Sequence, residues 1–168
     1  VLQRLRKHNL RLNLKKSLFA APKIPYLGHV LTPKGVLPGQ DKTKALIEAK
    51  PPQTVKQLKA FLGTLNYFRN YIPSFARRAG PLYRLTRQDS PWNRGPLPPL
   101  ALNIFNTLKR AIAAATTRAF PTSHGKFHLF VDGALGDAKL EGGLGACLMQ
   151  ENKQGKLQVI AFASRQLH

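Results

Sequence analysis

Apolar residues recur at helical spacing over most of the first 115 positions of the chain. In the clearest case, the segment 55–71, five of them fall on one face of a predicted helix: Leu58, Phe61, Leu62, Leu65 and Phe68. Thr54 is a suitable N-cap for this helix, and Pro73 ends it. The same kind of pattern predicts helices over 1–10, over 41–50 with Asp41 as the cap, over 75–85 and over 100–115.

The period changes to two in the segments that are expected to form strands. Tyr26–Leu31 predicts one strand, and the turn Thr32–Gly35 returns the chain as Val36–Leu37, so that a hairpin forms. A short strand is predicted at 12–14, one or two helical turns at 15–20, and three strands at 127–132, 143–150 and 157–164. Residues 90–99 hold four prolines and predict a linker at a domain boundary, with Pro91 and Trp92 pinning it to the helices before it. These segments together predict a mixed α/β fold.

The charge of the chain points to a polyanionic partner. Lys and Arg number 27 against 7 Asp and Glu, a formal net charge of +20. Residues 1–90 hold 18 of the basic and 3 of the acidic residues, so the binding surface is expected in the first half. Nucleic acid is the expected partner. A membrane is not, because no apolar run is long enough to span one and no basic helix has a wide apolar face. Cys147 is the only cysteine, which suits a reducing, intracellular compartment.

One face of the predicted helix 55–71 carries polar and small residues, namely Lys56, Lys59, Gly63, Asn66 and Tyr67. Gly63 costs a helix interior about 1 kcal/mol relative to Ala, so its presence needs a reason. One interpretation is that a nucleic-acid duplex approaches the helix backbone closely, with Lys neutralising phosphate. The other is that Gly63 lets a second helix pack closely. The sequence leaves both interpretations open.

Several segments, in order along the chain, resemble one known family. The segments 61–73 (FLGTLNYFRNYIP) and Ala79–Leu82 are similar to the thumb of retroviral and Ty3/gypsy-type reverse transcriptases. Tyr26–His29 (YLGH), followed by Leu31–Val36, resembles the palm hairpin called the primer grip. Phe130–Asp132 and Ala161–Leu167 resemble the first and third strands of the attached RNase H domain.

The resemblance implies separate roles for the hairpin and for the thumb helix. In the family the hairpin holds the primer 3′ end, and the thumb helix tracks the minor groove of the template–primer, an RNA/DNA or DNA/DNA duplex. The implied segments are the end of the palm (1–40), the thumb (41–90), a linker with a connection helix (91–122) and the first part of an RNase H-like domain (123–168). The candidate nucleic-acid-binding residues are Tyr26, Leu27, Gly28, His29, Lys56, Lys59, Gly63, Asn66, Tyr67 and Arg69. His29 is expected either to contact phosphate or simply to pack.

The catalytic groups of the family are expected to be incomplete. Both reactions of these enzymes use two Mg²⁺ ions held by carboxylates. The chain contains no Asp-Asp pair of the kind that the polymerase site uses. Asp132 stands where the family places its first RNase H carboxylate, and Asp137 or Glu141 could serve instead as loop acids. The pattern departs from the family at Gly133–Ala134 and in a longer connection after them, and the later carboxylates would follow His168. We therefore expect neither nucleotide addition nor RNA cleavage by this chain alone, and no tightly bound Mg²⁺.

Two functions remain for such a chain. It begins without Met and in mid-helix, which suggests a fragment or processed part of a Pol polyprotein, with the remainder of that polyprotein as partner and the cytoplasm, a virus-like particle or the nucleus as location. The alternative is a non-enzymatic nucleic-acid-binding or scaffold protein co-opted from a retroelement. An unrelated basic protein of the ribosomal type is a weaker third possibility.

Overall fold

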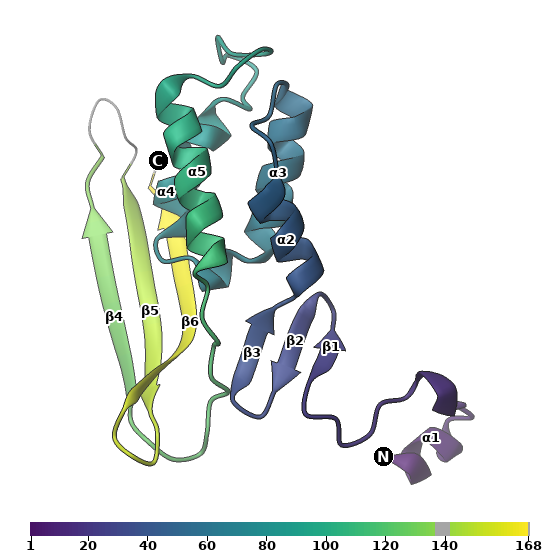
Figure 1. The fold of residues 1–168 in the computed structure, drawn as a ribbon. Coiled ribbons are helices and arrows are strands. Elements are labelled where there is room, and N and C mark those ends of the chain that lie inside the picture. Colours follow the sequence, from purple (N-terminus) through teal and green to yellow (C-terminus); the bar gives the residue numbers. More distant parts are fainter. Residues whose placement is uncertain (137–141, 168) are drawn as a thin grey trace.

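The computed structural model describes residues 1–136 and 142–167. Within residues 40–113 four helices pack together; a three-stranded antiparallel sheet formed by residues 24–38 lies at one end of them, and a second one, formed by residues 127–134 and 143–166, lies along their side (Figure 1). The mixed α/β fold predicted from the sequence is confirmed. No helix in the described part of the chain has the length and apolar character needed to cross a membrane.

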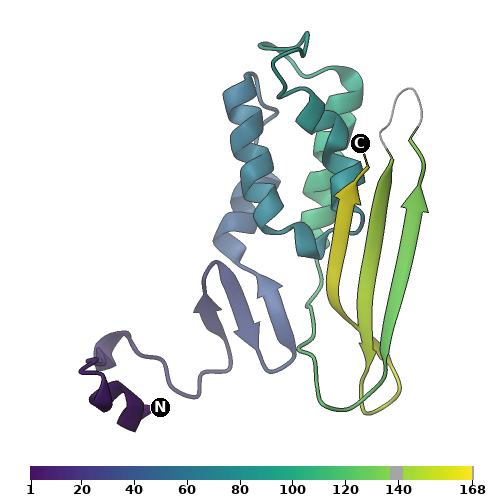
Figure 2. The same cartoon turned by 180° about the vertical axis from the view of Figure 1, so that it is seen from behind.

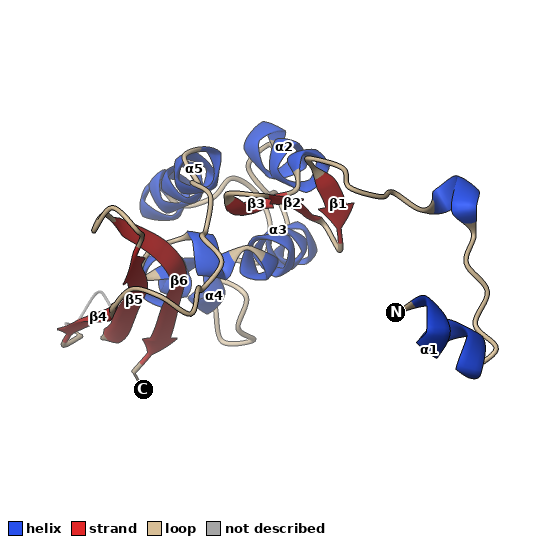
Figure 3. Ribbon diagram, turned by 90° about the horizontal axis from the view of Figure 1, so that it is seen from below, coloured by secondary structure: helices blue, strands red, loops and turns tan. Residues whose placement is uncertain are grey.

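The first 23 residues form an arm that leads away from the helices and sheets (Figure 3). It contains the short helix α1 (Leu2–Lys7) and a 3₁₀ turn, η1 (Leu14–Lys16), and neither buries a residue. The strand predicted at 12–14 is wrong. Asn13 instead caps the 3₁₀ turn, since its side-chain oxygen accepts a hydrogen bond from the Lys16 N–H at 3.3 Å.

The small sheet has two turns where the sequence predicted one. Its strands are β1 (Ile24–Tyr26), β2 (His29–Thr32) and β3 (Gly35–Pro38). The predicted continuous strand 26–31 is interrupted because Leu27 and Gly28 both have positive φ angles, 46° and 72°. A two-residue hairpin turn needs this conformation, and Gly28 adopts it readily. Tyr26 therefore pairs with His29, and the residues expected to grip nucleic acid lie at a hairpin tip.

The helices agree closely with the sequence pattern. They are α2 (Gln40–Glu48), α3 (Val55–Tyr67), α4 (Phe75–Arg84) and α5 (Pro99–Ala113), with the 3₁₀ turn η2 (Arg69–Tyr71) continuing α3. Thr54 caps α3 as predicted, its hydroxyl oxygen accepting from the Gln57 N–H at 3.3 Å. The predicted cap of α2 is wrong: Gly39 is the N-cap, and Asp41 lies in the first turn, where its charge still favours the helix.

The helices share one hydrophobic core. All five predicted core residues of α3 are buried, and α5 adds Ala101, Phe105, Leu108 and Ile112 to the same cluster. The Phe61 and Phe105 rings lie 4.5 Å apart. Trp92, in the proline-rich segment 90–99, is buried in this core, and its indole N–H donates to the Pro96 carbonyl at 3.0 Å. Helix α5 thus packs against α2 and α4 in this core.

The second sheet consists of β4 (Phe127–Ala134), β5 (Gly143–Glu151) and β6 (Leu157–Gln166). Strand β6 lies beside the helices and β4 forms the outer edge (Figure 2). The Ser164 hydroxyl accepts from the Ala76 N–H at the start of α4, at 2.9 Å. Gly80 of α4 faces the end of the Gln166 side chain, which lies 2.7 Å from where a Cβ on Gly80 would stand.

Candidate nucleic-acid interface

Helix α3 presents its polar face to solvent. Lys56, Lys59, Gly63, Asn66 and Tyr67 are all exposed, on the side away from the buried residues of the helix. A Cβ built on Gly63 would meet no atom within 4 Å. The helix-packing interpretation of Gly63 therefore has no neighbour to support it in the described part of the chain. The exposed helix backbone at Gly63 is accessible to a partner molecule.

The tip of the β1–β2 hairpin lies against the end of this face. The Tyr67 hydroxyl donates to the Leu27 carbonyl, and it lies 3.2 Å from Nδ1 of His29. His29 Nδ1 is also 3.1 Å from the Leu27 carbonyl, which can only accept. A proton on Nδ1 satisfies both contacts, so we assign that tautomer. Two groups of candidate residues that are nearly forty positions apart thus form one surface.

The His29 ring faces this surface and also packs against three aromatic rings. Its ring lies 5.1 Å from the Tyr67 ring, 5.7 Å from Phe68 and 5.8 Å from Tyr71, the last in a stacked arrangement. The helix and the hairpin are therefore held together by an aromatic cluster. Of the two roles expected for His29, packing is visible in the fold.

Lys42 belongs to the same surface, although the sequence pattern did not single it out. Its ammonium lies 4.5 Å from the centre of the Tyr67 ring, a cation–π contact. It also lines a pocket of about 410 Å³ at the hairpin tip, with Gly28, His29 and Asp41 among its other walls. Nothing in the local sequence around Lys42 signals this position, because it depends on how α2 packs beside the hairpin.

Arg69 has a partner within the protein. Its guanidinium donates through Nη2 to the Ser164 carbonyl in β6 at 2.6 Å. The side chain therefore joins the end of α3 to the second sheet, and any contact with nucleic acid would have to be made by its remaining donors.

Asp132 is exposed on β4 and pairs with Gly145 across the sheet. It lines a shallow pocket of about 140 Å³ together with Ser74, Cys147 and Phe162. Among residues 1–136 and 142–167, no three His, Cys, Asp or Glu side chains are grouped so that they could hold a metal ion. Asp137 and Glu141, the alternative loop acids, lie outside the described residues. Asp132 can supply one carboxylate of a two-metal site, and the described residues around it do not form a complete set of ligands.

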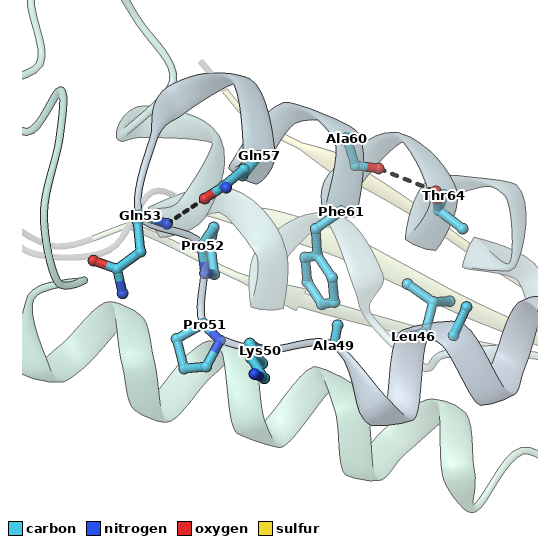
Figure 4. A pocket seen from close by; sticks show the side chains of 11 residues that line it. Leu46, Ala49, Lys50, Pro51, Pro52, Gln53, Gln57, Ala60, Phe61 and Thr64 are labelled. Atoms are coloured by element: carbon cyan, nitrogen blue, oxygen red, sulfur yellow. Dashed lines mark hydrogen bonds between the residues drawn. The ribbon is translucent and has the colours of Figure 1, made fainter.

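A groove of about 470 Å³ runs between α2 and α3 beside the polar face (Figure 4). Leu46, Ala49 and Phe61 line it with apolar side chains. The polar groups at its rim are satisfied internally: the Gln57 side-chain oxygen accepts from the Gln53 N–H at 2.7 Å, and the Thr64 hydroxyl donates to the Ala60 carbonyl at 3.1 Å. Among the residues that line the groove there is no nucleophile with a neighbouring base and no carboxylate pair.

Two comparisons of sequence point to the same group of proteins. A family model described as an RNase H-like domain found in reverse transcriptase matches residues 100–168. The retrovirus-related Pol polyprotein from transposon opus of Drosophila melanogaster is 36% identical over 176 residues, which covers 100% of this chain and 17% of that protein. The Gag-Pol polyprotein of baboon endogenous virus (strain M7) is 35% identical over 141 residues, covering 83% of this chain and 8% of the relative. The chain thus spans less than a fifth of the length of these relatives.

Solved structures share the fold. The foamy viral protease-reverse transcriptase in complex with RNA/DNA hybrid gives a TM-score of 0.71 at 21% identity, covering 92% of this chain and 20% of that one. A second structure of that enzyme, the dRH form in complex with ds DNA, gives a TM-score of 0.75 at 20% identity, covering 99% of this chain and 28% of that one. By sequence, the homologues of this chain are Pol polyproteins of retrotransposons and retroviruses, residues 100–168 match the RNase H-like domain found in reverse transcriptase, and the fold is shared with solved reverse transcriptase structures.

Proposed function

We propose that this chain is the part of an RNA-directed DNA polymerase/RNase H polyprotein that grips the template–primer duplex, with little preference for sequence. The observation that carries the proposal is the joining of the hairpin tip to the exposed face of α3 through Tyr67, Leu27 and His29. This arrangement makes a continuous surface that is rich in cations and open at Gly63. The solved relatives that bind RNA/DNA hybrid and DNA duplex support the choice of partner.

Phosphate contacts dominate the proposed binding. Lys56, Lys59 and Lys42 can neutralise backbone phosphates, while Asn66 and Tyr67 touch sugars and base edges. Tyr26 adds an exposed aromatic ring at the hairpin. No set of side chains on this face has the paired geometry that reads a particular base.

Catalysis in our proposal belongs to the longer protein. The chain has no adjacent aspartates, and Asp132 is the one carboxylate that we assign to an RNase H metal site. Asp132 would hold Mg²⁺ together with carboxylates that the described residues do not supply. Mg²⁺ in that site would activate the water that cleaves RNA.

The N-terminal arm favours the polyprotein over a free-standing co-opted protein. Leu2, Leu14, Leu18 and Phe19 are 61–72% exposed on it. Apolar side chains exposed together on a segment mark a surface that packs against further protein. We assign the remainder of the Pol polyprotein as that partner, with an intracellular location.

Titration of labelled duplexes tests the proposal. RNA/DNA hybrid and DNA duplexes of unrelated sequence should bind with similar affinity, and the affinity should fall steeply with salt. For a DNA duplex the slope of log K against log salt is about −0.9 per phosphate neutralised. A flat salt dependence, or a strong preference for one sequence, would overturn the proposal.

A further inference from the structure

A short segment after α5 connects the two sheets. The Arg118 N–H donates to the Val36 carbonyl at 3.0 Å, and the Val36 N–H donates back to Arg118 at 2.8 Å, so that Arg118 extends the small sheet beside β3. The next residue, Ala119, donates its N–H to Val159 in β6 at 2.7 Å. In the ribbon this segment runs down from α5 between β6 and β3 (Figure 1).

The close approach at this segment requires a glycine in the hairpin. Gly35 has a φ of 135°, which side chains rarely adopt, and a Cβ there would lie 2.1 Å from the Arg118 carbonyl oxygen. The backbone of Arg118 is therefore held against the hairpin at a defined position.

The Arg118 side chain reaches back into the aromatic cluster. Its guanidinium carbon lies 4.2 Å from the centre of the Tyr71 ring, and Nη2 donates to the Tyr71 hydroxyl at 3.3 Å. Its Nε is buried with no hydrogen-bond partner among the described residues. A buried donor without a partner costs free energy, which offsets part of what the contacts of this arginine with Tyr71 contribute.

The contacts continue from Tyr71 to the nucleic-acid face. Tyr71 is 4% exposed and stacks on His29, with an interplanar angle of 25°. His29 in turn contacts the Tyr67 hydroxyl, which holds the hairpin tip at Leu27. An unbroken series of contacts therefore links Arg118 to the residues that face the duplex.

We propose that Arg118 is a positioning residue for nucleic-acid binding: through Tyr71 it sets the orientation of His29 and Tyr67, without itself contacting the duplex. This inference rests on the proposed function. On this inference, the segment that leads into the RNase H-like sheet controls the geometry of the surface that binds the duplex.

The test compares Arg118→Met with Arg110→Met in the 168-residue chain. Methionine keeps the length and apolar contact of the side chain but removes its charge and donors, and Arg110 is an exposed arginine on α5, away from the cluster. Arg118→Met should weaken duplex binding by roughly tenfold, within the range of couplings between contacting residues. The slope of log K against log salt should stay unchanged, because no phosphate contact is lost. The NMR signals of the His29 ring should move in the absence of nucleic acid. Arg110→Met should do none of these.

Each other outcome has a definite meaning. If Arg118→Met lowers only the melting temperature, while binding by the folded fraction and the His29 signals are unchanged, Arg118 only packs and the inference is wrong. A slope that falls by about one would make Arg118 a phosphate contact and also overturn it. If Arg118→Met fails to fold, Tyr71→Phe, which keeps the ring and removes the acceptor, should shift the same His29 signals. Should the unaltered chain fail to bind any duplex, the proposed function fails, whereas the His29 signals still report whether Arg118 positions that ring.

Discussion

The hydroxyl of Tyr67 donates a hydrogen bond to the backbone carbonyl of Leu27, 40 positions earlier in the chain. One residue lies at the end of α3 and the other at the tip of the β1–β2 hairpin. This bond places the two candidate binding elements side by side.

Tyr67→Phe keeps the ring and removes the hydrogen bond to Leu27. The free energy of unfolding should fall by up to about 1 kcal/mol, the net value of a typical hydrogen bond. Tyr67→Ala also removes the ring and should in addition weaken duplex binding by about 1 kcal/mol, as other aromatic contacts to nucleic acid do. Urea unfolding and duplex titration of both variants measure these effects. Equal affinity in the Ala and Phe variants would show that the ring does not touch nucleic acid.

Gly63→Ala should separate folding from binding. The added methyl meets no atom of the protein, and Ala is favoured over Gly in a helix by about 1 kcal/mol, so stability should hold or rise. The same methyl stands between the helix backbone and a duplex, so binding should weaken. Thr107→Ala, which also raises helix propensity but lies on α5, is the control and should leave binding unchanged. If Gly63→Ala binds as well as the unaltered chain, α3 does not track a groove.

Lys59→Ala should weaken binding to all duplexes alike and lower the salt slope by about one, because one phosphate contact is lost. Lys153→Ala removes the same charge from the exposed turn between β5 and β6 and serves as the control. Duplex titrations over a series of salt concentrations measure both slopes. Equal slopes for the two variants would place the binding surface elsewhere.

Two tyrosines should make the protein sensitive to alkali. Burial raises the pKa of Tyr71 above its ordinary value, against the opposing effect of Arg118, and burial likewise raises the pKa of Tyr83. The unfolded chain then releases these protons at a lower pH than the folded one. Their contribution to stability is therefore present below about pH 10 and is lost as the pH rises toward the folded-state values.

Urea unfolding between neutral pH and pH 11 should thus show a falling free energy of unfolding on the alkaline side. A chain with both Tyr71→Phe and Tyr83→Phe should lose less stability over the same range. An identical alkaline loss in this double variant would show that other groups cause it.

The purified chain should extend no primer with Mg²⁺ or Mn²⁺, because adjacent aspartates are missing from it. A primer-extension assay measures this, with an active reverse transcriptase added to a parallel sample to show that the substrate is competent. Incorporation that persists in a preparation free of other polymerases would contradict our assignment of catalysis to the longer protein.

Local patterns in the sequence were enough to identify most elements and one face of the candidate site. The spacing of Leu58, Leu62 and Leu65 predicted the buried side of α3, and Thr54 its start, because a helix repeats every few residues and its cap lies next to it. The hairpin turn at Leu27–Gly28 was missed because Leu27 adopts a positive φ that its side chain does not suggest. The cap of α2 was misplaced for a similar reason: Asp41 is a good capping residue, but the chain enters the helix at Gly39.

Which distant residues meet depends on how the elements pack together. Lys42 over Tyr67, Arg118 against Tyr71 and Arg69 on Ser164 each join residues that no local pattern connects. Periodicity reports which side of an element is apolar, but not which element covers it or at what angle. Those choices depend on packing the whole core at once, including the tight approach at Gly35. The elements and their exposed side chains can therefore be derived from local sequence patterns, whereas the packing of the core brings those side chains together into one surface.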